Sequence, residues 1–129
     1  MPVLDTDILV GALRGDIGAE RRILAIGENA RFTTTISAVE IFQGAFLHAK
    51  KEEKLGDAFR LFSHLNIYEF DYPASLVAAD IFARNRLSGN IVDAFDVLIA
   101  SVCLAKNETL ITRNISDFSR IPRLKTEKW

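Results

Sequence analysis

The apolar segment Ala94–Ala105 limits the folds open to this chain more than any other stretch. Only Asp96 and Ser101 are polar within it, so it predicts a helix that packs against a sheet over most of its circumference. An unpaired charge in such a helix is costly to bury. Asp96 therefore needs a cation, a hydrogen-bonding partner or a water-filled crevice, and which of these it has bears directly on function.

Strand and helix signals alternate along the whole chain. Short runs of apolar or β-branched residues are each followed by apolar residues at helical spacing. This alternation is typical of an α/β fold, and we expect three layers, α/β/α, around a mostly parallel sheet of about five strands. The expected strands cover residues 2–5, 31–36, 66–71, 109–112 and 122–129, and the expected helices lie at 8–10, 19–26, 37–49, 55–65, 74–86 and 94–105.

Length and composition narrow the class of protein. The 129 residues fit one domain, residues 1–129. No run approaches the ~20 apolar residues that a membrane span needs, and Met1–Asp7 has no secretory signal, so we expect a cytoplasmic protein. The only cysteine, Cys103, predicts a core residue and excludes a disulfide framework or a cysteine zinc site. A net charge of −1 argues against nonspecific coating of nucleic acid, while a local basic rim remains open.

Polar groups from distant segments are expected at one edge of the sheet. In such sheets ligands bind beyond the carboxyl ends of the strands, where the strand order reverses. Asp5 directly follows the first strand and Asn114 the fourth, whereas Glu40 and Asp96 lie near the starts of helices. Two carboxylates ~4 Å apart repel by about 4 kcal/mol at an effective dielectric near 20. A divalent cation relieves that repulsion, and oxygen ligands favour Mg²⁺ or Mn²⁺ over zinc.

Two of the acids have explanations as helix-start residues. Glu40 stands three residues after Ser37, which is the spacing of a capping box. Asp93 stands three residues after Asn90, so with Asn90 as N-cap it would lie in the first turn and interact with the helix dipole. Both roles are compatible with metal binding.

The remaining acids have structural alternatives as well. Asp96 lies one turn too deep for capping, but it could form a buried ion pair with Arg113 or Arg84. Asp5 could cap the helix that follows the first strand, for which Thr6 is another N-cap candidate. Asp7 is interpreted as a cap and Asp117 as a turn residue before Phe118.

Taken together, these segments resemble the PIN-domain family, and the small size of the chain resembles its VapC-type toxins. The resemblance covers nearly the whole chain. It implies a strand order of 3-2-1-4-5, metal-binding acids at Asp5, Glu40 and Asp96, and supporting hydroxyls at Thr6 and Thr112. The family's fourth acid falls at Asn114 or Asp117, and Asp93 is a further candidate ligand. The resemblance is carried by Val3–Val10, Thr35–Ala45, Asp96–Ser101, and Leu110–Asn114 with Asp117 and Phe118.

The resemblance also implies an activity. It predicts a Mg²⁺- or Mn²⁺-dependent endoribonuclease, the toxin of a toxin–antitoxin pair, with catalytic residues Asp5, Glu40, Asp96 and Thr112. The implied partners are an RNA substrate, a cognate antitoxin and a second copy in a homodimer. An aromatic face is expected to be chiefly core, with part of it open to an antitoxin helix or a second copy; it comprises Phe42, Phe46, Phe59 and Phe62. The candidate RNA-binding cations are Arg14, Arg84, Arg86 and Arg113.

Two other functions are consistent with parts of the pattern. Asp5-Thr6-Asp7 superficially matches the Asp-x-Asp of haloacid-dehalogenase-type phosphotransferases, in which the first aspartate is phosphorylated. Leu9 does not fit that motif, which weakens the match. Alternatively, the chain is a non-catalytic binding module that keeps the fold, and the amide of Asn114 at an acidic position keeps this interpretation open.

Overall fold

A five-stranded parallel sheet forms the centre of the molecule. The computed structural model describes residues 1–129, and its strands lie in the order β3-β2-β1-β4-β5, so the expected order and parallel direction are confirmed. Every neighbouring pair is parallel. The strands are short: β1 (Val3–Leu4), β2 (Phe32–Thr34), β3 (Asn66–Tyr68), β4 (Leu110–Ile111) and β5 (Thr126–Glu127).

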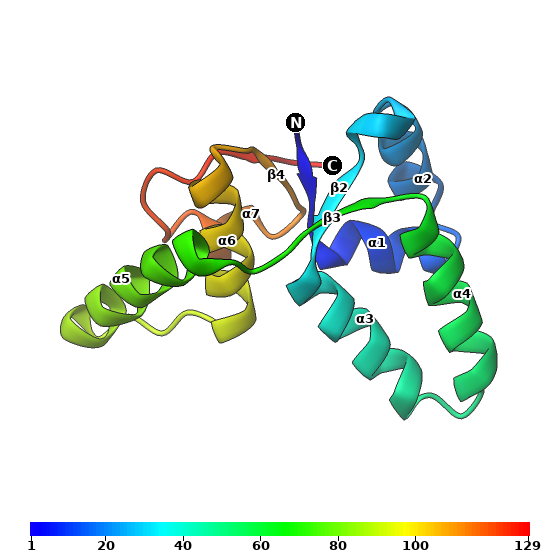
Figure 1. The fold of residues 1–129 in the computed structure, drawn as a ribbon, viewed down its shortest axis with the longest axis horizontal. Coiled ribbons are helices and arrows are strands. Elements are labelled where there is room, and N and C mark those ends of the chain that lie inside the picture. Colours follow the sequence, from blue (N-terminus) through cyan, green and yellow to red (C-terminus); the bar gives the residue numbers. More distant parts are fainter.

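Helices cover both faces of the sheet and complete the three layers (Figure 1). Side chains alternate between faces along a strand, so Val3 packs among residues of α5 and α6. Leu4 packs among residues of α1, α2, α3 and α4 on the other face. The helices are α1 (Thr6–Leu13), α2 (Ile17–Leu24), α3 (Thr35–Leu47), α4 (Lys51–Ser63), α5 (Tyr72–Ser88), α6 (Ala94–Lys106) and the short α7 (Ile115–Phe118), with a 3₁₀ turn at Glu28–Ala30.

The register of β1 and β4 determines what lies at the carboxyl edge of the sheet. Leu4 pairs with Ile111, and the Asp5 N–H donates to the Ile111 carbonyl at 3.0 Å. Asp5 and Thr112, each one residue further along its strand, are therefore neighbours. Helices α1 and α3 begin close to this edge (Figure 1), which brings their first turns to the same region.

Helices α1 and α6 both begin with an aspartate cap. The N-cap of α1 is Asp5, which confirms that alternative over Thr6 and Asp7, and its Oδ1 accepts a hydrogen bond from the Thr6 N–H. The N-cap of α6 is Asp93 rather than Asn90, because its Oδ1 accepts from the Phe95 and Asp96 N–H groups at 2.9 and 3.2 Å. In both cases the aspartate has a non-helical backbone and satisfies amide groups that the first turn leaves free.

The predicted capping box at Ser37 and Glu40 is wrong. Helix α3 begins at Thr35, earlier than expected, because Thr34 is extended and its Oγ1 accepts from the Ser37 N–H at 3.1 Å. Ser37 is thus the residue being capped and not the cap. Glu40 lies in the second turn, and its carboxylate is free to bind partners from other elements.

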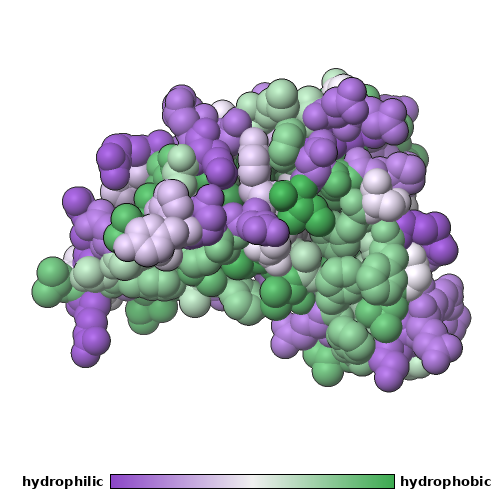
Figure 2. Space-filling view, in the orientation of Figure 1, coloured by the Kyte–Doolittle hydropathy of each residue, from purple (hydrophilic) through white to green (hydrophobic).

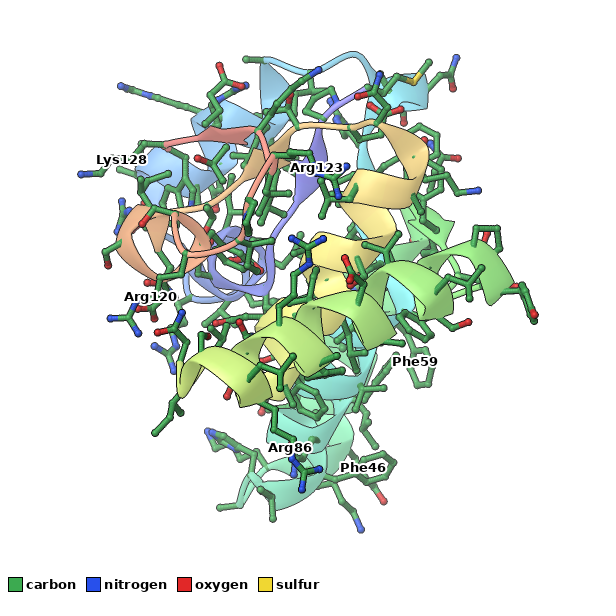
Figure 3. The ribbon with its side chains drawn as sticks, turned by 90° about the vertical axis from the view of Figure 1, so that its left-hand side faces the viewer. Phe46, Phe59, Arg86, Arg120, Arg123 and Lys128 are labelled. Atoms are coloured by element: carbon green, nitrogen blue, oxygen red, sulfur yellow. The ribbon has the colours of Figure 1, made fainter.

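The aromatic face divides between core and surface. Phe62 is buried, whereas Phe46 and Phe59 are 61% and 62% exposed, and both point away from the ribbon in Figure 3. These two residues belong to the part of the face that was expected to be open, and helical spacing alone does not identify them because it does not reveal which side of α3 and α4 meets the sheet. Cys103 is fully buried, as expected. None of the helices is both long and apolar enough to span a membrane.

Candidate functional site

An acidic cavity of about 520 Å³ opens at the carboxyl edge of the sheet. Asp5, Glu40, Asp96 and Asn114 all line it, so side chains from four distant segments meet as the topology predicts. Arg14 and Arg113 contribute the positive charges of its wall. The full lining is Asp5, Thr6, Asp7, Val10, Gly11, Arg14, Asp16, Glu40, Asp96, Arg113, Asn114 and Trp129.

Asp5 is the most deeply buried of the carboxylates, with 5% of its surface exposed. Its Oδ2 accepts from the Thr112 hydroxyl at 2.7 Å and its Oδ1 from the Thr6 N–H at 2.8 Å. Burial raises the pKa of Asp5 to about 7, against these hydrogen bonds, and the negative charge of Asp7 adds to the rise. No cation of the chain pairs with Asp5, so a positive charge from outside the chain would stabilise its charged form at neutral pH.

Glu40 is linked to Asp5 through Thr6. The Thr6 hydroxyl donates to Glu40 Oε1 at 2.7 Å and lies 2.9 Å from the Ser37 hydroxyl. Burial is the main cause that raises the pKa of Glu40, and the charge of Asp93 adds to it. Thr6 therefore fixes one Glu40 oxygen and leaves the other available at the cavity.

Asp96 has no hydrogen bond or ion pair to its side chain, although it is only half-exposed. Neither proposed partner forms an ion pair with Asp96, because Arg84 pairs with Asp80 at 3.1 Å and the acid nearest to Arg113 is Asp16, at 3.9 Å. The ion-pair alternative is thus wrong. Burial and the charges of Asp93 and Glu40 raise the pKa of Asp96 to about 6. Asp96 therefore lies unpaired in the wall of the acidic cavity.

The two candidates for a fourth acidic position, Asn114 and Asp117, contact each other. Asn114 Nδ2 donates to Asp117 Oδ2 at 2.9 Å. Asn114 lines the acidic cavity, whereas Asp117 lines a separate, smaller cavity of about 80 Å³ together with Asp93. The charge of Asp117 still contributes to the raised pKa of Asp96, so both residues influence the site.

The oxygen-rich lining fits a hard divalent cation by its chemistry. In this conformation no three carboxylates are spaced as a metal-binding cluster. Carboxylate, amide and hydroxyl oxygens are nevertheless the ligands that Mg²⁺ and Mn²⁺ prefer. Asp5, Glu40 and Asp96 line one cavity and none of them forms an ion pair, and burial raises the pKa of all three. A divalent ion would stabilise their charged forms.

Asp7 and Trp129 are parts of this region that the sequence pattern did not reveal. Asp7 is not a helix cap: its Oδ2 accepts from the Arg113 N–H at 2.8 Å and lies 3.1 Å from the Thr112 hydroxyl, whose hydrogen is donated to Asp5. Its Oδ1 accepts from the Trp129 indole N–H at 2.9 Å. No local signal relates residues 7 and 129, because the contact depends on how β5 aligns with β4.

The four candidate RNA-binding arginines separate into two groups. Arg14 and Arg113 line the acidic cavity. Arg84 and Arg86 lie on α5, where Arg84 pairs with Asp80 and the exposed Arg86 extends outward (Figure 3). Neither of the α5 arginines lines the acidic cavity.

Comparison with known proteins places the fold in a family. The family model for the PIN domain matches residues 3–124. The chain is 31% identical to the ribonuclease VapC2 of Rickettsia felis over 98% of its own length and 96% of that protein. It is 23% identical to the tRNA(fMet)-specific endonuclease VapC of Shigella flexneri, with the same shares covered.

Solved structures give the same result. The crystal structure of VapBC2 from Rickettsia felis bound to a promoter DNA fragment superimposes with a TM-score of 0.91 and 28% identity, over 99% of this chain and 98% of that one. A member of the VapBC family of toxin-antitoxin systems from Mycobacterium tuberculosis, VapBC-5, shares the fold with a TM-score of 0.71 and 21% identity, over 98% and 95% of the two chains. The chain described here belongs to the PIN-domain family.

Proposed function

We propose that this protein is a divalent-metal-dependent endoribonuclease and the toxin of a toxin–antitoxin pair. One observation carries the proposal: Asp5, Glu40 and Asp96 come from three distant segments and line one cavity, and none of them forms an ion pair with an arginine. The Rickettsia felis relative, which is called a ribonuclease, supports RNA as the substrate class. We propose that the cleavage takes place in the cytoplasm.

The proposed roles follow from the contacts. Asp5, Glu40 and Asp96 would hold the ion, with Asn114, Asp117 or Asp93 completing its surroundings. When bound, such an ion lowers the pKa of a water molecule and neutralises charge that develops on the phosphate. Thr112 holds one oxygen of Asp5, and Thr6 orients Glu40. No side chain of the protein needs to act as the nucleophile.

The attraction between the protein and RNA must come from local groups of positive side chains, because the net charge of the whole chain is only −1. Arg14 and Arg113 are the candidates that the geometry favours, since both line the acidic cavity. Arg84 and Arg86 have less support because they lie on α5, outside it. We propose structured RNA as the substrate class, with tRNA as the first one to test, since a relative is named for tRNA cleavage.

An exposed apolar surface supports a protein partner. Figure 2 shows hydrophobic residues gathered over the region of α3 and α4, where Val39, Phe46 and Leu47 are 52–81% exposed and line a shallow hollow. We assign this surface to the cognate antitoxin. The homodimer stays a prediction, to be checked by the mass of the purified protein in solution.

The alternative functions have less support. Both oxygens of Asp7 accept hydrogen bonds, from the Arg113 N–H and the Trp129 indole N–H, so Asp7 is poorly placed as the second acid of a phosphotransferase. Asn114 supports a non-catalytic binding module, but the three candidate metal-binding acids, Asp5, Glu40 and Asp96, still line the cavity.

The test is incubation of the pure protein with total tRNA in Mn²⁺, in Mg²⁺ and in chelator, beside Asp5→Asn. Cleavage is expected only for the wild-type protein with metal. A wild-type protein that binds a neighbouring gene product tightly but cleaves no RNA in either metal would contradict the proposal and favour the binding module.

Thr112→Val is expected to reduce cleavage by roughly 10- to 100-fold, the usual range for losing a residue that supports a metal ligand. The valine keeps the shape of threonine but removes the hydroxyl that donates to Asp5. Loss of that hydrogen bond raises the pKa of Asp5 further, so the deficit should be largest at low pH. Single-turnover cleavage from pH 6 to 9 measures this, with Thr112→Ser as the control that retains the hydroxyl. Equal rates for the valine and serine variants would contradict it.

A further inference from the structure

Arg113 lies flat against the indole ring of Trp129 at the edge of the acidic cavity. The guanidinium carbon is 3.5 Å from the ring centroid, which is close for a cation–π contact. Both residues line the cavity. The stack therefore places a permanent positive charge in the same cavity as Asp5, Glu40 and Asp96, and this charge forms an ion pair with none of the three.

Asp7 holds both members of the stack in place. Its Oδ1 accepts from the Trp129 indole N–H at 2.9 Å, and its Oδ2 accepts from the Arg113 backbone N–H at 2.8 Å. One carboxylate thus fixes the ring and the backbone of the residue that stacks on it. The ring also packs against α1, because a Cβ added at Gly11 would lie only 3.1 Å from its edge.

The guanidinium of Arg113 remains available for a ligand. Its side chain is 52% exposed, its nearest acid is Asp16 at 3.9 Å, and it donates no side-chain hydrogen bond. Asp16 is itself engaged, since its other oxygen caps α2 through the Ala19 N–H at 3.0 Å. Stacking uses the flat face of a guanidinium and leaves its N–H edge free, and that edge matches the oxygens of a phosphate.

We propose that Arg113, held on Trp129, binds a backbone phosphate of the RNA next to the one that is cleaved, and that Trp129 is a positioning residue for it. This inference rests on the proposed function. The guanidinium of Arg113 covers one face of the indole ring, so the proposal does not involve an RNA base stacking on that face. The Asp7–Trp129 hydrogen bond then sets where the substrate backbone enters the site.

The test is steady-state cleavage of total tRNA in Mn²⁺ by R113Q, W129L, W129F and the double variant W129L/R113Q. R113Q should raise KM about tenfold and leave kcat within about twofold, as for loss of one charge-assisted hydrogen bond. W129L should raise KM similarly, and the double variant should be no worse than R113Q, since both changes remove one interaction. W129F retains a ring without the N–H and should show an intermediate KM.

Two further readouts separate positioning from general stability. The slope of the logarithm of RNA affinity against the logarithm of salt concentration should become shallower in R113Q and W129L, by the amount expected for about one phosphate contact. Trp129 is the only tryptophan, so its fluorescence reports on this site alone, and the change on adding tRNA should be smaller in R113Q. Arg22→Gln is the matched control: it removes the same charge from a residue that pairs with Glu127 at 2.9 Å and does not line the cavity.

Several results would overturn the inference. One is a KM for R113Q equal to that of Arg22→Gln. Another is a KM rise in W129L that adds to that of R113Q, which would indicate base stacking on the ring. If W129L does not fold, R113Q and W129F still decide, because both keep a ring in place. A wild-type protein that neither cleaves nor binds tRNA overturns the proposed function together with this inference, whereas an active wild-type with unaffected variants overturns this inference alone.

Discussion

Asp96→Asn is expected to abolish RNA cleavage and to leave the metal-free protein at least as stable as the wild-type. The loss of activity should be at least about 100-fold, because even residues that only support a metal ligand contribute 10- to 100-fold. Stability should not fall because Asp96 has no partner, and burial and the charges of Asp93 and Glu40 raise its pKa to about 6. Removing its charge therefore removes repulsion.

Thermal melts in chelator and cleavage assays in Mn²⁺ measure the two effects separately. A structural carboxylate would behave in the opposite way, since breaking a buried pair costs about 3–5 kcal/mol. Asp80→Asn is the matched control, because Asp80 is an exposed acid that pairs with Arg84 on α5, and it should change neither property. An Asp96→Asn protein that melts well below the wild-type in chelator would count against the metal site.

Metal-free protein should become less stable as the pH rises from about 4 to 8, and Mn²⁺ should reverse this. Burial raises the pKa of Asp5 from 3.8 to about 7, so the folded protein binds the proton more tightly than the unfolded chain. That stabilisation is complete below about pH 4 and is lost as the pH passes through 7. For Asp5 it is on the order of 4 kcal/mol, and the raised pKa of Asp96 acts in the same direction.

Bound metal requires the charged carboxylates, so its stabilising effect should grow with pH. At a concentration of 100 Kd it amounts to about 2.7 kcal/mol, or roughly a 10 °C increase in Tm for a chain of this size. Melts at pH 5, 6, 7 and 8, in chelator and in excess Mn²⁺, check both effects. Asp5→Asn should lose most of the pH slope and most of the Mn²⁺ shift, while Asp80→Asn should keep both. Stability in chelator that increases over this range would refute the prediction.

Much of the fold was predictable because its signals are local. The strand before Asp5, the α5 helix that ends at Gly89 and the apolar helix that carries Asp96 were all expected from residues close in sequence. Gly89 has φ of 74°, which glycine adopts at little cost. Short elements were less exact: β2 stops at Thr34 because that residue turns to cap α3.

The acidic cavity was predictable for a topological reason. In a parallel sheet with helical crossovers the carboxyl ends of neighbouring strands share one edge. Asp5 and Asn114 follow β1 and β4, which proved to be neighbours, and Glu40 and Asp96 lie in early turns of helices at that edge. The resemblance to a family added the strand order and the expected chemistry.

Residue types and their spacing thus determined the alternation of elements and the acids that gather at one edge, because both depend on neighbours a few positions apart and on a general rule of chain topology. Only the tertiary structure decided which groups satisfy those acids and which surfaces stay open. Asp7 meets Trp129 across 122 residues, Asp96 has no arginine partner, and Phe46 and Phe59 face outward. These outcomes depend on strand register and helix rotation, which arise when the layers pack and have no counterpart in local spacing.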